Sequence, residues 1–150
     1  MKTKTNYILT LLLVLLLTAG FAPKSVSRRY INLPNPPVQA PFSDAVQVGD
    51  TLYLAGRIGI DPKTGKPPES IDEEIKILLD RTNAVLEQAG MSMDDLVSVQ
   101  VFCPDLSLYD KFNAAYRARF SKEFPARAFI GSGPLLRGGH FEMQGIAVKR

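Results

Sequence analysis

The sequence predicts an α+β domain in which a mixed β-sheet carries both of its helices on one face. Three observations lead to this fold class. Short apolar or alternating runs bounded by Gly, Pro and Asp predict strands. Two longer segments have apolar residues at helical spacing. These elements follow one another as β, ββ, α, β, α, ββ, an order that is typical of α+β domains.

Length and composition indicate one globular domain of near-neutral charge. The chain has 150 residues, of which 45% are hydrophobic and 22% are charged, which excludes general disorder. The formal charge is +3, but without Lys2 and Lys4 only 16 basic residues face 15 acidic ones. We therefore expect no nucleic-acid partner. One cysteine, Cys103, and one histidine, His140, cannot build a zinc site, so we expect no metal.

Residues 1–22 have the pattern of a secretory signal peptide. Two lysines precede an apolar run over residues 8–19, and small residues follow it. A membrane-spanning helix needs about 20 apolar residues, so this shorter run favours cleavage over a permanent anchor. Cleavage after Ala19, Gly20 or Ala22 is open. We expect residues 23–150 to form the mature domain, exported to the periplasm or the medium and free of the membrane after cleavage.

The first half of the mature chain predicts strands and then a long helix. Residues 29–33 read as a strand, and residues 45–48 and 51–57 read as a hairpin joined by Gly49 and Asp50. Ser70 caps a helix that Gly90 ends. Its apolar stripe consists of Ile71, Ile75, Leu78, Leu79, Thr82, Leu86 and Ala89. The face expected to meet solvent carries Glu74, Lys76, Asp80, Arg81 and Glu87.

The second half predicts a strand, a helix and two further strands. Residues 97–102 alternate as in a strand, and Asp105 or Ser107 caps the second helix. One side of this helix carries Leu108, Phe112, Ala115, Tyr116 and Phe120. Residues 127–132 and 140–148 read as strands, with a loop over residues 135–139. Both faces of the predicted sheet carry apolar residues, but two helices cover only one. The pattern therefore predicts a homo-oligomer that buries the other face.

Several segments of the chain resemble one known family. They lie at residues 41–45, 48–56, 61–65, 86–90, 94–96, 99–102, 124–127 and 142–149. The most specific combination is Pro125, Ala126 and Arg127, followed fifteen residues later by Glu142 before an apolar strand. In these segments the chain resembles the Rid family of reactive intermediate/imine deaminases, the YjgF-like proteins, from about residue 31 to residue 150.

The resemblance implies a fold, an assembly and an activity. Such proteins have a chorismate-mutase-like α+β fold and form homotrimers with a cleft at each subunit boundary. They hydrolyse 2-imino acids and their 2-aminoalkenoate (enamine) tautomers to 2-oxo acids and ammonia without a metal or an organic cofactor. The resemblance assigns Arg127 to the substrate carboxylate and Glu142 to a water molecule. It also places Gly56 and Asn113 near the site.

These residue types suit that chemistry. The planar fork of an arginine matches a carboxylate in two hydrogen bonds, and a glutamate can accept a proton from water. Phe141 and Met143 are apolar, so we expect the side chain of Glu142 to point away from the core. Each residue also has a purely structural interpretation. Gly56 can serve a bulge, Asn113 can be an ordinary helix residue, Cys103 reads as a small buried hydrophobe, and His140 reads as a loop residue.

The chain departs from the family pattern at several positions near the expected cleft. Phe42 and Ala55 stand where the family commonly has hydroxyl side chains, Arg57 adds a charge, and Phe129 replaces a common cysteine. Phe42 and Phe129 are expected to contact the substrate. These departures keep open a non-catalytic alternative, a trimer that binds a small carboxylate or a protein. A third alternative, action on RNA, fits poorly with the near-neutral charge.

Overall fold

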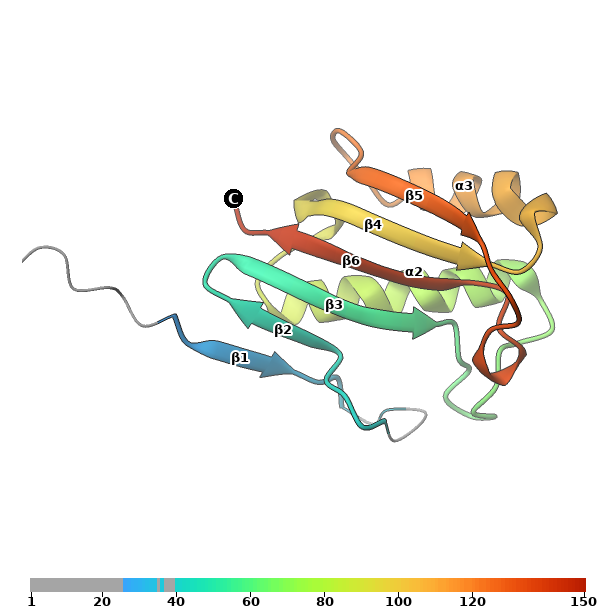
Figure 1. Ribbon diagram of the computed structural model, residues 1–150, viewed down its shortest axis with the longest axis horizontal. Coiled ribbons are helices and arrows are strands. Elements are labelled where there is room, and N and C mark those ends of the chain that lie inside the picture. Colours follow the sequence, from blue (N-terminus) through green and yellow to red (C-terminus); the bar gives the residue numbers. More distant parts are fainter. Residues whose placement is uncertain (1–25, 35, 37–39) are drawn as a thin grey trace, which may run out of the picture.

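The computed structural model describes residues 26–34, 36 and 40–150, and the leader expected at residues 1–22 lies outside them. Six strands form one mixed sheet in the order β1-β2-β3-β6-β4-β5 (Figure 1). The strands are β1 (Arg28–Ile31), β2 (Ala45–Val48), β3 (Thr51–Ile58), β4 (Leu96–Cys103), β5 (Ala126–Gly131) and β6 (Glu142–Val148). The predicted α+β class and the order of its elements are confirmed.

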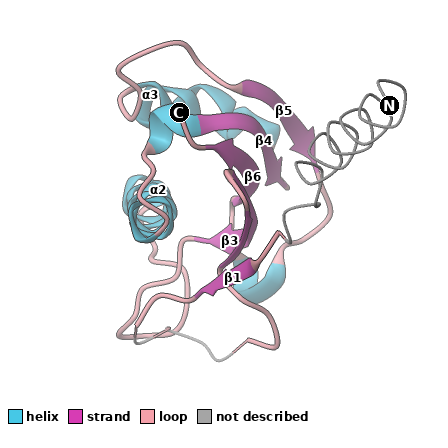
Figure 2. Ribbon diagram, turned by 90° about the vertical axis from the view of Figure 1, so that its left-hand side faces the viewer, coloured by secondary structure: helices cyan, strands magenta, loops and turns pink. Residues whose placement is uncertain are grey.

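Two helices, α2 (Ile71–Gln88) and α3 (Tyr109–Arg117), lie on the same face of the sheet (Figure 2). Ser70 caps α2 as expected, because its hydroxyl accepts from the backbone N–H of Glu73 at 3.4 Å. Asp105 caps the short turn before α3 by accepting from the N–H of Ser107 at 2.9 Å. In the described ranges, no helix is long and apolar enough to cross a membrane.

The pairing of the strands places the C-terminal half of the chain around α3. All neighbouring strands are antiparallel except β4 and β5, which run parallel and are connected through α3. In this register Arg127, near the start of β5, lies beside Val99 of β4. Val99 is 1% exposed and belongs to the face that the helices cover. The crossover therefore brings Arg127 to the same side of the sheet as α3.

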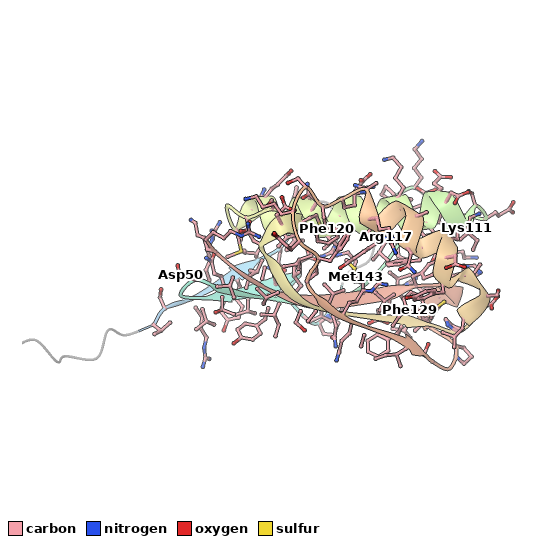
Figure 3. All side chains as sticks on the ribbon, turned by 90° about the horizontal axis from the view of Figure 1, so that it is seen from above. Asp50, Lys111, Arg117, Phe120, Phe129 and Met143 are labelled. Atoms are coloured by element: carbon pink, nitrogen blue, oxygen red, sulfur yellow. The ribbon has the colours of Figure 1, made fainter. Side chains whose placement is uncertain are left out.

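The hydrophobic core lies between the sheet and the two helices. Its fully buried members include Leu52, Ile75, Leu78, Leu79, Leu86, Val101, Cys103, Phe112 and Phe141. Figure 3 shows Met143 between the sheet and the helices, with other side chains projecting from the opposite face. One assignment within the long helix was wrong. Glu74, expected on the solvent face, is 0% exposed and lies among the core residues.

The face of the sheet away from the helices is open and partly apolar. Tyr53 and Val148 on this face are 50% and 38% exposed, and Val97 at an irregularity of β4 is 46% exposed. The pattern of apolar residues on both faces is therefore present in the fold. The homo-oligomer inferred from that pattern stays a prediction.

Candidate functional site

Arg127 lies in a hollow between β5 and α3. Its guanidinium donates from one Nη to the side-chain oxygen of Asn113 at 2.5 Å. The hollow encloses about 330 Å³ and is also lined by Tyr109, Tyr116, Phe124 and other residues of this region. Within the described part of the chain, no carboxylate forms an ion pair with Arg127. The positive charge of Arg127 is therefore held in place and left available to an anion from outside the protomer.

Aromatic rings support the faces of this guanidinium. Its Cζ atom lies 4.6 Å from the ring centre of Tyr116, 5.8 Å from that of Phe129 and 6.0 Å from that of Tyr109. Cation–π contacts of this length stabilise a fixed orientation of the guanidinium plane. Burial raises the pKa of Tyr116 to about 12, and the positive charge of Arg127 opposes this rise. The Tyr116 hydroxyl therefore stays protonated beside Arg127 at neutral pH.

Glu142 lies on the other face of the sheet, against Gly56. Phe141 and Met143 are 0% and 3% exposed, so Glu142, between them, points away from the core as expected. A side chain at Gly56 has no room, because a Cβ atom there would lie 2.2 Å from Oε1 of Glu142. The register of β3 against β6 shifts between Leu54 and Arg57. Gly56 thus lies at an irregularity of the strand and in close contact with the carboxylate of Glu142, and its place in a substrate site stays a prediction.

A larger cavity extends from Glu142 along the C-terminal end of β3. It encloses about 460 Å³ and is lined by Phe42, Ala55, Gly56, Ile58, Leu136 and Glu142, among others. Arg57 and Asp44 also line it, and they form an ion pair at 2.9 Å. Burial lowers the pKa of Arg57, Asp44 raises it, and the nearby positive charge of Arg81 lowers it further. The cavity therefore has apolar walls and also contains the ion pair between Arg57 and Asp44.

The structure brings the six residues singled out from the sequence into two separate groups. Arg127 and Asn113 line the hollow on the helix side, and the ring of Phe129 lies 5.8 Å from the Arg127 guanidinium. Glu142, Gly56 and Phe42 line the cavity that reaches the open face. One protomer therefore presents a guanidinium and a carboxylate on opposite faces of its sheet.

Two arrangements near the site escaped the sequence analysis. Glu74 reaches through the core to the segment before β6, where its Oε2 lies 2.7 Å from Nδ1 of His140. His140 lies in the loop before β6, as expected, and its side chain is 43% exposed. Arg57 and Asp44 form the second arrangement, because the hairpin turns their neighbouring positions toward each other. The helical spacing indicates that Glu74 is buried, since position 74 falls between Ile71 and Leu78 on the buried stripe.

The described residues contain no group of three or more His, Cys, Asp or Glu side chains placed to hold a metal ion. Cys103 is buried, as expected for a small hydrophobe, and its Sγ lies 3.0 Å from the backbone oxygen of Asp105. Burial raises the pKa of this thiol, which makes it a poor nucleophile.

Fold and site together define a class: a small α+β domain with an anchored arginine beside one helix and a carboxylate on the open face of its sheet. Comparison with known families agrees with this class. The model of the family described as endoribonuclease L-PSP matches residues 33–149. The chain belongs to this family, which comprises the YjgF, RutC and Rid proteins.

Curated relatives and solved structures match along almost their whole length. A RutC family protein of Pyrococcus abyssi is 37% identical over 110 residues, 73% of this chain and 87% of its own. The 2-iminobutanoate/2-iminopropanoate deaminase of Escherichia coli is 32% identical over 118 residues, 77% of this chain and 92% of its own. The crystal structure of the YjgF gene product of E. coli is 32% identical, covers 81% of this chain and 99% of its own, and has a TM-score of 0.75. The YjgF-like fold expected from the resemblance is confirmed.

Proposed function

We propose that the protein hydrolyses 2-imino acids and their enamine tautomers to 2-oxo acids and ammonia. The observation that carries the proposal is the state of Arg127, a guanidinium anchored by Asn113 with no carboxylate partner among the described residues. A 2-imino acid carries the carboxylate that such a group binds. The deaminases of E. coli and mouse, at 32% and 33% identity, give further support.

In this proposal the site forms between neighbouring copies in a homotrimer. Arg127 of one copy faces Glu142 of the next, because the two side chains point from opposite faces of one sheet. The open apolar face, with Tyr53 and Val148, supplies the surface that the copies bury. Light scattering of the purified protein tests the assembly. A trimer is expected, and a monomer would contradict a shared site.

The reaction needs few groups because the imine is already electrophilic. Arg127 binds the carboxylate in two hydrogen bonds and fixes the plane of the C=N bond. Glu142 takes a proton from a water molecule as the water oxygen adds to the imine carbon, and the imine nitrogen takes a proton from solvent, which gives a carbinolamine. Glu142 then returns its proton to the amino nitrogen of the carbinolamine. The C–N bond breaks, ammonia leaves with the bonding pair, and the hydroxyl releases its proton to water as the O–H becomes the C=O of the 2-oxo acid.

The activity is tested by generating 2-iminobutyrate in place with an amino-acid oxidase and following its decay. The wild type is expected to accelerate the decay, and Arg127→Ala is expected to match buffer. If wild type and variant both match buffer, the deaminase proposal is wrong. The second candidate, a non-catalytic carboxylate-binding trimer, then remains. Phe42, Ala55 and Phe129 favour this candidate, because each lacks a polar group common in the family.

Export is a separate proposal that rests on the pattern of residues 1–22. It predicts a mature N-terminus near residue 20 or 23 and protein outside the cytoplasm. Fractionation of cells followed by mass spectrometry of the intact chain tests both points. An unprocessed chain found with the cytoplasmic fraction would contradict export and leave the proposed activity untouched.

A further inference from the structure

The cavity beside Glu142 is lined by more arginines than carboxylates. Three arginines line it, Arg57, Arg81 and Arg137, together with Asp44 and Glu142. Asp44 is already engaged on both oxygens. Oδ1 accepts from Arg57 at 2.9 Å, and Oδ2 accepts from a backbone N–H at 2.7 Å. Glu142 lies against Gly56 and has no arginine among its ion-pair partners in the described ranges.

Arg81 is the uncompensated charge in this group. Its side chain is half-buried and forms no hydrogen bond or ion pair with the described residues. The side chain of Arg57 is 10% exposed and lies close enough to Arg81 for the two positive charges to repel each other. Arg137 stands at the exposed rim and donates to the backbone oxygen of Gly65 at 3.3 Å. The guanidinium groups of Arg57 and Arg81 repel each other, and the carboxylate of Asp44 is already engaged. This repulsion costs free energy, and a bound anion would remove that cost.

We propose that Arg81, with Arg57 and Arg137, binds a second carboxylate, so that the preferred substrates are 2-imino dicarboxylic acids. This inference rests on the proposed function, which places the imine beside Glu142. The cavity continues from Glu142 past Gly56 to Arg57, and Gly56 has no side chain to close that path. The carboxylate next to the imine then binds Arg127 of the neighbouring copy, and the distal one binds Arg81.

Binding of the 2-oxo acid products tests this subsite without catalysis. Titration calorimetry compares 2-oxoglutarate and oxaloacetate with 2-oxobutyrate on the wild type, Arg81→Met and Arg29→Met. The dicarboxylic acids are expected to bind about tenfold more tightly than 2-oxobutyrate to the wild type, the worth of one charged hydrogen-bonded contact. Arg81→Met is expected to remove this preference. Arg29→Met, which removes an exposed charge outside the cavity, is expected to keep it.

The outcomes separate this inference from the proposed function. Equal affinities on the wild type, or a preference that survives Arg81→Met, overturn the subsite. If 2-iminobutyrate is hydrolysed in that case, the proposed function still stands. Preferential binding of dicarboxylates by a protein that hydrolyses no imine supports the subsite and overturns the proposed function.

A different observation concerns the segment that leads into Glu142. The Glu74 carboxylate, 0% exposed, accepts at Oε1 from the backbone N–H groups of His140 at 2.8 Å and Phe141 at 3.3 Å. Its Oε2 lies 2.7 Å from Nδ1 of His140. A buried carboxylate that accepts from two backbone N–H groups of one segment and contacts a ring nitrogen of the same segment fixes the position of that segment. Glu142 follows Phe141 directly in the chain.

We infer that Glu74 is a positioning residue, which holds Glu142 in place through the backbone of His140 and Phe141. Glu74→Gln keeps an oxygen for the two backbone donors but faces Nδ1 of His140 with an amide. His140→Ala removes the ring alone. Both variants are expected to lower kcat about three- to tenfold with KM changed less than twofold, because a displaced base affects the chemical step. Glu73→Ala, on the exposed face of the same helix, is the matched control.

Amide hydrogen exchange supplies a readout that needs no activity. The N–H groups of His140 and Phe141 are expected to exchange faster in His140→Ala, and faster still in Glu74→Gln, than in the wild type or Glu73→Ala. Wild-type exchange and wild-type kcat in both Glu74→Gln and His140→Ala would overturn the inference. If the wild type hydrolyses no imine, the proposed function is wrong, and the exchange rates still decide whether Glu74 holds the segment.

Discussion

The hollow around Arg127 and the cavity around Glu142 hold side chains of opposite charge. In the hollow a positive charge is held by an amide oxygen and by aromatic rings, at 2.5 Å from Asn113 and 4.6 Å from the centre of Tyr116. In the cavity a negative charge lies over a glycine, on the other face of the sheet. The nearest neighbours of each charged group are neutral, and neither Arg127 nor Glu142 forms an ion pair with the described residues. Neither group is therefore neutralised within the described part of its own protomer.

This difference has a consequence for how a site can arise. A group compensated inside its own chain has little affinity left for a ligand, whereas an uncompensated, fixed group is ready to bind one. One protomer offers two such groups, Arg127 and Glu142, on opposite faces of its sheet. Under the proposed function, each of them is a half-site that a neighbouring copy completes.

Loss of the charge in the hollow is expected to have the largest effect. Arg127→Ala removes both hydrogen bonds to the substrate carboxylate, a change worth about 2–5 kcal/mol in a buried pair. We expect kcat/KM for 2-iminobutyrate to fall at least about 100-fold, and Arg127→Lys to fall between this variant and the wild type. Steady-state kinetics with imine generated in place measures both. Activity of Arg127→Ala within about twofold of wild type would show that the hollow does not bind the substrate.

Mixed oligomers test whether the two half-sites come from different copies. Arg127→Ala and Glu142→Gln are each expected to be nearly inactive. When the two variants assemble at random in a ring, about a quarter of the boundaries combine an intact Arg127 with an intact Glu142. We therefore expect co-expression to restore about a quarter of wild-type activity, because only these boundaries contain a complete site. Absence of any gain would place both residues in a site within one copy.

A matched pairing controls for nonspecific stabilisation in these mixtures. Asn113→Ala damages the same hollow as Arg127→Ala, since Asn113 and Arg127 are bonded within one protomer. Co-expression of these two variants is expected to give no more than the sum of their separate activities. A gain in this control would mean that mixing itself raises activity, and the complementation result would then carry no weight.

A smaller effect is expected in the cavity when Gly56 gains a methyl group. The Cβ atom of Gly56→Ala would lie 2.2 Å from Oε1 of Glu142, so the carboxylate has to move. We expect kcat to fall about tenfold with a smaller change in KM, because an ångström-scale displacement of the base slows the chemical step. Gly133→Ala is the matched control, since nothing lies within 4 Å of its Cβ position. An unchanged kcat in Gly56→Ala would exclude Glu142 as the base.

The elements of the fold were predictable because local rules agree with the tertiary structure here. Ser70 caps α2 where the sequence signal lies, and the hairpin turns at Gly49, whose φ is +59°. The alternation around Glu142 also placed its side chain correctly, because a strand has a period of two residues. Periodicity fixes the face on which a side chain lies. It therefore predicted that the side chain of Glu142 leaves the core, whereas the assignment of Arg127 and Glu142 to a site came from the family resemblance and stays a prediction.

Glu74 was wrongly assigned to the solvent face of the helix because its side chain is charged. Helical spacing places it between Ile71 and Leu78 on the buried stripe, and it is 0% exposed. A buried carboxylate requires donors, and these come from His140 and Phe141, more than sixty residues away in the chain. Their arrival is a property of the folded topology. The pairing of Arg57 with Asp44 depends on the hairpin in the same way, so sequence periodicity shows neither.

The smallest expected effect returns to the hollow and concerns the hydroxyl of Tyr116. This hydroxyl is buried and has no hydrogen-bond partner among the described residues. Tyr116→Phe keeps the ring under Arg127 and removes an unsatisfied polar group. At pH 7 we expect the free energy of unfolding to stay within about 1 kcal/mol of wild type, or to rise. Urea unfolding measures this difference, and kcat/KM is expected to change by less than about threefold.

The sign of the pH dependence sharpens this prediction. The ordinary pKa of a tyrosine is about 10, and burial raises the pKa of Tyr116 to about 12 in the folded chain. The neutral hydroxyl is therefore favoured by folding, and this contribution is present in full below pH 10 and is lost as the pH rises toward 12. Tyr116→Phe lacks that loss, so its stability relative to wild type should increase above pH 10. A variant that instead loses activity tenfold at neutral pH, with unchanged stability, would make the hydroxyl a donor to the reacting molecule. In that case the hollow would supply chemistry as well as the carboxylate contact, and the contrast between the two half-sites would no longer hold.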